Sequence, residues 1–113
     1  MNYQQYIPLI VEELKKAGPV KIILFGSYAY GTASNDSDLD IMVVTSDETI
    51  PNSFEEKNKI YIKFAQAIDH LKAKIPIDLI IHTKAMHKIF TQNNSMFAQE
   101  IQKKGKVLYS IEE

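Results

Sequence analysis

The chain of 113 residues contains no cysteine and no arginine, and each absence excludes a class of chemistry. Without cysteine, the protein has no disulfide framework, no thiolate metal site and no thiol nucleophile. Without arginine, it has no rigid bidentate guanidinium for gripping phosphate, so lysine, backbone amides or a metal ion must do that work. The lack of cysteine also fits a reducing cytoplasm, where we expect the protein to act.

A charge excess and long hydrophobic runs are also missing. Thirteen lysines against fourteen acidic residues give a net charge of -1, so no overall positive field attracts long nucleic acids or anionic membranes. Apolar runs such as residues 20–25 and 41–44 are far too short to span a bilayer. The first five residues show no signal-peptide pattern. We therefore expect one cytoplasmic domain over residues 1–113.

Periodicity predicts alternating helices and strands. Apolar residues recur at helical spacing between Tyr3 and Ala17, and Gly18-Pro19 should end this first helix. Ser53 and Glu56 form a capping box that begins a long helix, whose apolar stripe runs from Phe54 to Leu71. Two short helices should follow, over 83–91 and 95–104, with Gly105 capping the second. Strands are expected at 20–25, 39–45, 76–82 and 107–111, the last at an edge of the sheet.

The candidate catalytic and metal-binding residues lie at the ends of expected strands. Gly26-Ser27 closes the first expected strand, and Asp38-Leu39-Asp40 opens the next. Residues two apart in a strand point to the same face, so Asp38 and Asp40 can converge on one cation. Asp78 lies in another apolar strand, where a buried charge is costly unless it is paired or bound to metal.

Three carboxylates on adjacent strands suit Mg²⁺ or Mn²⁺, which also bind substrate phosphates. Two such ions can hold the attacking and leaving oxygens of an in-line phosphoryl displacement. Gly26, which has no Cβ, lets a phosphate approach the backbone, and Ser27 with nearby amides can form an anion site. The competing interpretation is a turn, residues 35–38, held by Asx-type hydrogen bonds. Turn chemistry does not explain carboxylates inside apolar strands.

Three segments together resemble the minimal nucleotidyltransferases of the polymerase β superfamily: residues 26–32 (GSYAYGT), residues 36–40 (DSDLD) and residues 77–79 (IDL). The closing segment, residues 101–109, is similar to the C-terminal signature of that family. The resemblance implies an α/β (α+β) fold, with a short mixed β-sheet flanked by helices.

The resemblance also implies a function. Gly26 and Ser27 would contact the nucleoside triphosphate, Asp38 and Asp40 would hold the metals, and Asp78 would complete the metal site and help to activate the nucleophile. The protein would be the antitoxin of a HEPN/MNT module. This antitoxin would transfer AMP from ATP to a tyrosine of the HEPN ribonuclease toxin. One departure is Tyr30, which stands where relatives often have arginine.

Two other functions are open at this level. An antitoxin without catalysis would neutralise its partner by binding alone, and the missing arginine favours this alternative. Transfer to a small molecule, as in aminoglycoside nucleotidyltransferases, is the third, but 113 residues leave little room for an extra substrate-binding domain. His70, His82 and His87 are not spaced as a metal site, so packing or surface roles are expected for them.

Overall fold

A four-stranded mixed sheet is the centre of the computed structural model, which describes residues 2–111. Its strands are β1 (Lys21–Phe25), β2 (Leu39–Val44), β3 (Ile77–His82) and β4 (Lys106–Ser110), in the order β3-β2-β1-β4. β1 pairs antiparallel with both β2 and β4, whereas β2 and β3 run parallel. The expected short mixed sheet is confirmed, with β3 and β4 as its edges.

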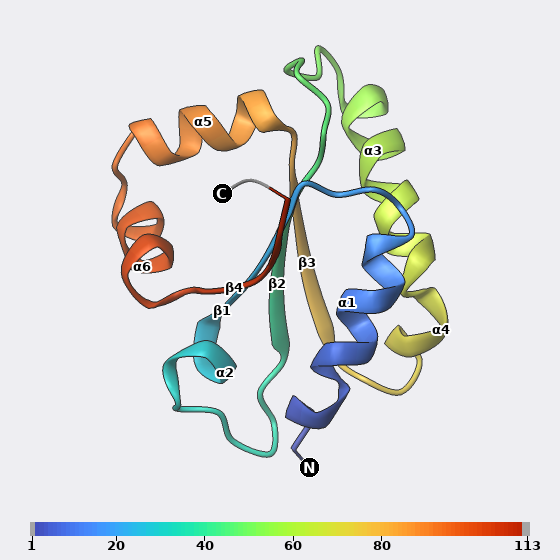
Figure 1. Ribbon diagram of the computed structural model, residues 1–113, viewed down its shortest axis with the longest axis vertical. Coiled ribbons are helices and arrows are strands. Elements are labelled where there is room, and N and C mark those ends of the chain that lie inside the picture. Colours follow the sequence, from blue (N-terminus) through green and yellow to red (C-terminus); the bar gives the residue numbers. More distant parts are fainter. Residues whose placement is uncertain (1, 112–113) are drawn as a thin grey trace.

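Helices cover both faces of the sheet (Figure 1). On one side lie the 3₁₀ turn η1 (Gln4–Tyr6) and the helices α1 (Ile7–Lys15), α3 (Phe54–Ala67) and α4 (Asp69–Lys72). On the other side lie α5 (Lys84–Gln92) and α6 (Met96–Lys104). The short helix α2 (Gly26–Tyr30) follows directly at the end of β1.

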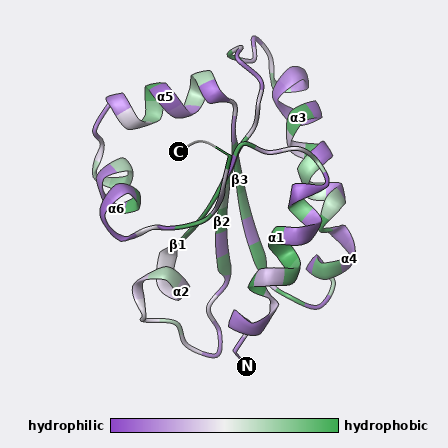
Figure 2. Cartoon of the chain, viewed as in Figure 1, coloured by the Kyte–Doolittle hydropathy of each residue, from purple (hydrophilic) through white to green (hydrophobic). Residues whose placement is uncertain are grey.

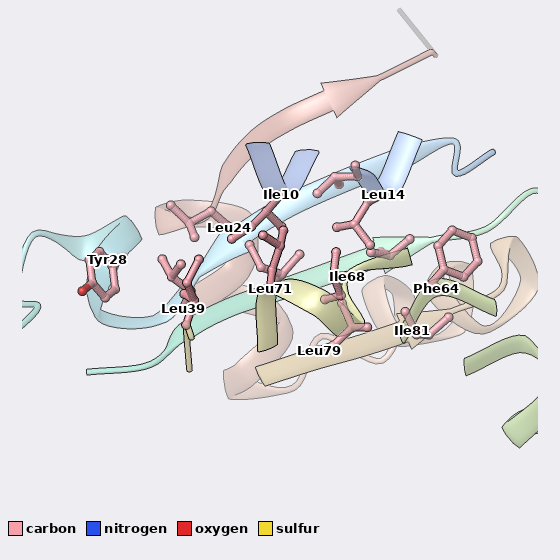
Figure 3. Packing of buried hydrophobic residues seen from close by; sticks show 14 of the residues in the cluster. Ile10, Leu14, Leu24, Tyr28, Leu39, Phe64, Ile68, Leu71, Leu79 and Ile81 are labelled. Carbon is pink, nitrogen blue, oxygen red and sulfur yellow. The ribbon is translucent and has the colours of Figure 1, made fainter. Parts of the chain in front are cut away.

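Alternation along the central strands divides the core between these two faces. Ile22 and Leu24 of β1 pack with α1, α3 and α4 in the larger cluster, part of which is shown in Figure 3. Ile23 and Phe25 point the opposite way and pack with Ile101 of α6. Strand β1 is therefore buried on both faces, as its uninterrupted apolar run predicts. Figure 2 shows that the helices carry both hydrophilic and hydrophobic residues.

The capping signals mark the helix starts correctly. Ser53 Oγ accepts a hydrogen bond from the backbone N–H of Glu56 (3.1 Å), while the Glu56 carboxylate accepts from the N–H of Asn52 (2.8 Å). The long helix is interrupted, however, because Ile68 leaves helical geometry (φ -115°, ψ 12°) between α3 and α4. Phe54 is 83% exposed, so its assignment to the buried stripe was wrong. It lies in the first turn of α3, outside the apolar stripe that packs on the sheet.

Gly105 ends α6 by a different mechanism from the one expected. Its backbone is extended (φ -64°, ψ 152°), not left-handed as in a usual glycine cap. A Cβ here would lie 2.5 Å from the carbonyl oxygen of Ile101 and 3.2 Å from Ile23 Cγ2. Glycine is therefore required at this position by close packing. Among residues 2–111, no helix has both the length and the hydrophobicity to cross a membrane.

Candidate active site

Asp40 lies where three strand ends meet. It is the second residue of β2, and its register partners are Phe25, the last residue of β1, and Asp78, the second residue of β3. Register partners on neighbouring strands point to the same face, and their strands are about 4.8 Å apart. The structure therefore brings Asp40 and Asp78 together on the face that carries α5 and α6, as their strand positions predict. Asp38 directly precedes β2.

Gly26 packs directly against the Asp40 carboxylate. It follows Phe25, the partner of Asp40, and has a left-handed backbone (φ 72°). A Cβ at this position would collide with Asp40 Oδ2 and would lie only 2.8 Å from Asp40 Cγ. Glycine is therefore required here twice, for its backbone conformation and for the space that the carboxylate occupies.

Burial differs among the three carboxylates. Asp40 is partly buried, whereas Asp38 and Asp78 are exposed. The expectation that Asp78 carries a buried charge is wrong, because β3 is an edge strand and Asp78 lies near its open end. Burial therefore does not explain why an aspartate stands there, but its register position beside Asp40 remains a distinctive feature.

The three carboxylates share an electrostatic field. Partial burial raises the pKa of Asp40, and the negative charges of Asp78 and then Asp38 raise it further. Like charges gathered without a cation disfavour ionisation of the most enclosed member. The acidic cluster is therefore electrostatically prepared to accept positive charge.

The loop before β2 is held by serines. The N–H of Ser34 donates to Ser37 Oγ (2.8 Å), and the N–H of Ser37 donates to the carbonyl oxygen of Ser34 (3.2 Å). Within residues 2–111, the carboxylates of Asp36 and Asp38 make no hydrogen bond in this turn. The Asx-type turn is thus not the reason for these aspartates, and Asp38 is left available for a ligand.

Ser27 lines a different hollow from the aspartates. It borders a shallow cavity of about 240 Å³, together with Tyr28 and residues of the loop that follows α2. The Ser27 carbonyl oxygen accepts a hydrogen bond from the N–H of Thr32 (3.0 Å), which closes the turn behind α2. Gly26 connects the two features in sequence, since it contacts Asp40 on one side and precedes Ser27 on the other.

The donors fit a hard divalent cation, but not as a complete cage. Across residues 2–111, no three acidic or histidine side chains are arranged as a ready-made metal site. Mg²⁺ is commonly held by one or two carboxylates, with water and substrate phosphates filling its other positions. An oxygen-only set with Asp40 beside Asp78 suits that arrangement, and Asp38 is close enough to raise the pKa of Asp40.

Tyr30 presents a feature that sequence reasoning missed. Its hydroxyl oxygen is buried and has no hydrogen-bond partner among residues 2–111, and Lys104 Nζ lies 5.7 Å from the centroid of its ring. α6 thus places a cation beside the position where the resemblance to the family leads us to expect an arginine. No local signal could have revealed this pairing, because the two residues are far apart in the sequence.

His82 and His87 also form an unexpected pair. Their Nδ1 atoms lie 3.2 Å apart, and both rings contact Phe90. The pKa of His82 is lowered to about 4, mainly by burial and then by the positive charges of His87 and Lys57. The packing role expected for these two histidines agrees with this aromatic cluster, while His70 is exposed on α4.

The fold is similar to that of two solved structures, one of them a putative nucleotidyltransferase. The crystal structure of a toxin–antitoxin with AMP-PNP matches with 28% identity and a TM-score of 0.53, covering 91% of this chain and 72% of that one. A putative nucleotidyltransferase from Sulfolobus solfataricus shares the fold (TM-score 0.62, 16% identity), with 96% of this chain and 81% of that one covered.

Sequence comparison gives the same family. Caffeine-induced protein 16 of Schizosaccharomyces pombe is 36% identical over 73 residues, which are 63% of this chain but only 6% of the yeast protein. The family model "Polymerase beta, Nucleotidyltransferase" matches residues 9–113, nearly the whole chain. The chain therefore belongs to the polymerase beta nucleotidyltransferase family.

Proposed function

We propose that this chain is a single nucleotidyltransferase domain that transfers AMP from ATP to a tyrosine hydroxyl of a partner HEPN ribonuclease toxin. The observation that carries the proposal is the Asp40 carboxylate, which is seated against Gly26 and paired in register with Asp78. Family membership supports the reaction class. The similar toxin–antitoxin structure with AMP-PNP supports both the nucleotide and the antitoxin role.

Each site residue has a role in this proposal. Asp38 and Asp40 hold the divalent ions, Mg²⁺ or Mn²⁺, and Asp78 completes the site. Bound at these carboxylates, the ions supply charge neutralisation for the triphosphate and for the oxygens that enter and leave. Gly26 and Ser27 contact the triphosphate through the backbone N–H of the glycine and the hydroxyl of the serine, while the space beside the Gly26 Cα is filled by the Asp40 carboxylate.

The transfer is balanced without any further co-reactant. The acceptor hydroxyl oxygen attacks the α-phosphorus of ATP and forms a new phosphodiester bond. At the same time, the bond between the α-phosphorus and the oxygen that bridges it to the β-phosphate breaks. Pyrophosphate leaves with that electron pair. Asp78, exposed at the edge strand, takes the hydroxyl proton as general base. Its exposure suits this role, because an acceptor on another protein must reach it.

The proposal is tested by label transfer from α-labelled ATP to the product of the neighbouring gene, in the presence of Mg²⁺. The wild-type chain should label the partner, and Asp40→Asn should abolish labelling. Asp36→Asn is the matched control, because Asp36 is an exposed loop aspartate outside the proposed site and its loss should leave labelling intact. If the partner binds tightly but is never labelled, transfer is refuted.

A non-catalytic antitoxin is the second candidate, and one specific observation favours it. Tyr30 stands where the resemblance to the family leads us to expect an arginine, and its buried hydroxyl has no hydrogen-bond partner among residues 2–111. In that case the partner would be neutralised in the complex without ATP, and Asp40→Asn would neutralise it equally well. We place either activity in the cytoplasm, which the cysteine-free composition fits.

A further inference from the structure

The open edge of β3 forms the floor of a groove. Five consecutive residues, 79–83, line a cavity of about 270 Å³ together with residues of α3 and α5. Lys57, Ile60 and Tyr61 from α3 stand on one side, and Met86 from α5 stands on the other. Figure 1 shows β3 between these two helices. The groove begins at Leu79, one residue after Asp78.

Backbone groups on this edge have no partner in the sheet. The N–H of Leu39 donates to the carbonyl oxygen of Pro76, and the N–H of Thr45 donates to that of His82. Because the parallel ladder alternates, residues 76, 78, 80 and 82 face β2, and the N–H and C=O of Leu79 and Ile81 face outward. In the part of the chain that the structure describes, neither residue makes another backbone hydrogen bond.

These outward groups specify the kind of occupant. Leu79 and Ile81 are two residues apart, so their backbone donors and acceptors repeat about every 6.6 Å along the strand. Another extended backbone has the same repeat and can pair with them. Leu79 and Ile81 are 6% and 8% exposed, and their side chains pack into the larger core cluster, on the side that carries α1, α3 and α4. Helices α3 and α5 flank the edge of β3 on its two sides. If a second copy of the chain paired its own β3 here, its α3 and α5 would meet those of the first copy. A single extended segment without flanking helices avoids this conflict.

The charge of the groove indicates which side chains an occupant should carry. Lys57 is exposed on the wall, and among residues 2–111 no acidic side chain forms an ion pair with it. His82 is neutral at pH 7, because its pKa is lowered to about 4. The lining is otherwise mostly apolar, with Ile60 and Met86 among its members. An occupant with alternate apolar side chains and one carboxylate is complementary to this surface.

The other edge of the sheet is less suited to pairing. β4 carries Lys106 on its exposed edge, and its register with β1 is irregular between Ile22 and Ile23. Exposed lysines and bulges are features that discourage strand addition. Strand β3 has neither of these features over Leu79–Ile81.

We propose that the edge of β3 is a docking site for an extended, largely apolar segment of a partner protein, which adds as a fifth strand and places a carboxylate beside Lys57. Its main chain pairs with Leu79 and Ile81, and its apolar side chains contact Ile60 and Met86. Docking requires no nucleotide, so the site stands independently of AMP transfer.

The test uses a capped octapeptide of alternating valine and threonine with glutamate near one end, titrated into the isotope-labelled full chain and followed by NMR. The amide signals of Leu79 and Ile81 should shift and become protected from hydrogen exchange. The same peptide with alternate backbone nitrogens methylated should lose binding, because methylation removes the donors of one edge. Replacing its glutamate with lysine should weaken binding about twofold to fivefold, as expected for one exposed ion pair.

Two matched variants test whether Lys57 is the residue that contacts the carboxylate of the peptide. Lys57→Glu should reverse the preference between the glutamate and lysine peptides, while Lys59→Glu, on α3 but outside the groove, should leave it unchanged. Unshifted Leu79 and Ile81 amides at millimolar peptide would overturn the proposal. So would equal binding of the methylated peptide, or shifts confined to β4. None of these results depends on whether the chain transfers AMP.

Discussion

Replacing Gly26 with alanine should be far more costly than replacing other left-handed glycines of this chain. Gly26, Gly31 and Gly18 have similar backbones, with φ of 72°, 80° and 75°. A left-handed conformation costs an alanine about 1–2 kcal/mol at each position. The gain from a stiffer unfolded chain is common to all three substitutions and cancels in the comparison. What distinguishes Gly26 is the space around its missing Cβ.

At Gly31 and Gly18 an added Cβ meets no other atom of residues 2–111 within 4 Å, whereas at Gly26 it collides with the Asp40 carboxylate. Overpacking of this kind typically costs about 1–3 kcal/mol. Gly26→Ala should therefore lose about 1–3 kcal/mol more stability than Gly31→Ala or Gly18→Ala. For a chain of this size, each kcal/mol lowers the melting temperature by about 4 °C, so the extra fall should be about 4–12 °C.

Thermal unfolding of the three variants, followed by circular dichroism, measures the difference. A second substitution then identifies its cause: in an Asp40→Ala background the carboxylate is gone, and most of the excess cost of Gly26→Ala should disappear, leaving only the contact with the Asp40 Cβ at 3.1 Å. If Gly26→Ala melts together with Gly31→Ala in the wild-type background, the packing of Gly26 on Asp40 has no energetic importance. If the excess persists without the carboxylate, the contact has been wrongly identified.

Three further predictions concern single side chains. In EDTA, Asp40→Asn should melt at the same temperature as the wild type or higher, because burial and two neighbouring carboxylates raise the pKa of Asp40 and make its ionised form unfavourable at pH 7; a loss of about 1–3 kcal/mol would instead indicate a structural hydrogen bond. Tyr30→Phe should raise the free energy of unfolding by about 1 kcal/mol in urea titrations, since the hydroxyl is buried without a partner. Tyr28→Phe is its control and should lower stability, because the Tyr28 hydroxyl accepts from the N–H of Tyr3 (3.1 Å). The pKa of His82 is about 4 in the folded chain and 6.5 in the unfolded one, so the unfolded state binds more protons in this window and stability should fall as the pH is lowered through it. His82→Phe should reduce the loss between pH 7 and pH 5, and equal losses in both proteins would contradict the assignment.

Local sequence was sufficient for most secondary structure, because the signals are themselves local. Apolar runs with β-branched residues predicted the strands, and Ser53 marked the start of α3 through its own hydrogen bond. The break at Ile68 was missed, since the apolar stripe continues across it and no local signal interrupts the helical pattern. Gly105 was assigned the right place but the wrong conformation, because its neighbours Ile101 and Ile23 determine the need for glycine.

For the candidate site too, the sequence predicted some features and only the tertiary structure decided others. Sequence alone singled out Gly26, Ser27, Asp38, Asp40 and Asp78, because carboxylates and a glycine at strand ends are chemically unusual. Only the tertiary structure decided that Asp40 faces Asp78 in register and lies against Gly26, since strand order and pairing depend on contacts between distant segments. The same pairing made β3 an edge strand, which exposes Asp78 and leaves Leu79 and Ile81 without a pairing strand on their outer side among residues 2–111. No periodicity within β3 distinguishes an edge strand from a central one, because that difference lies in what packs beside it.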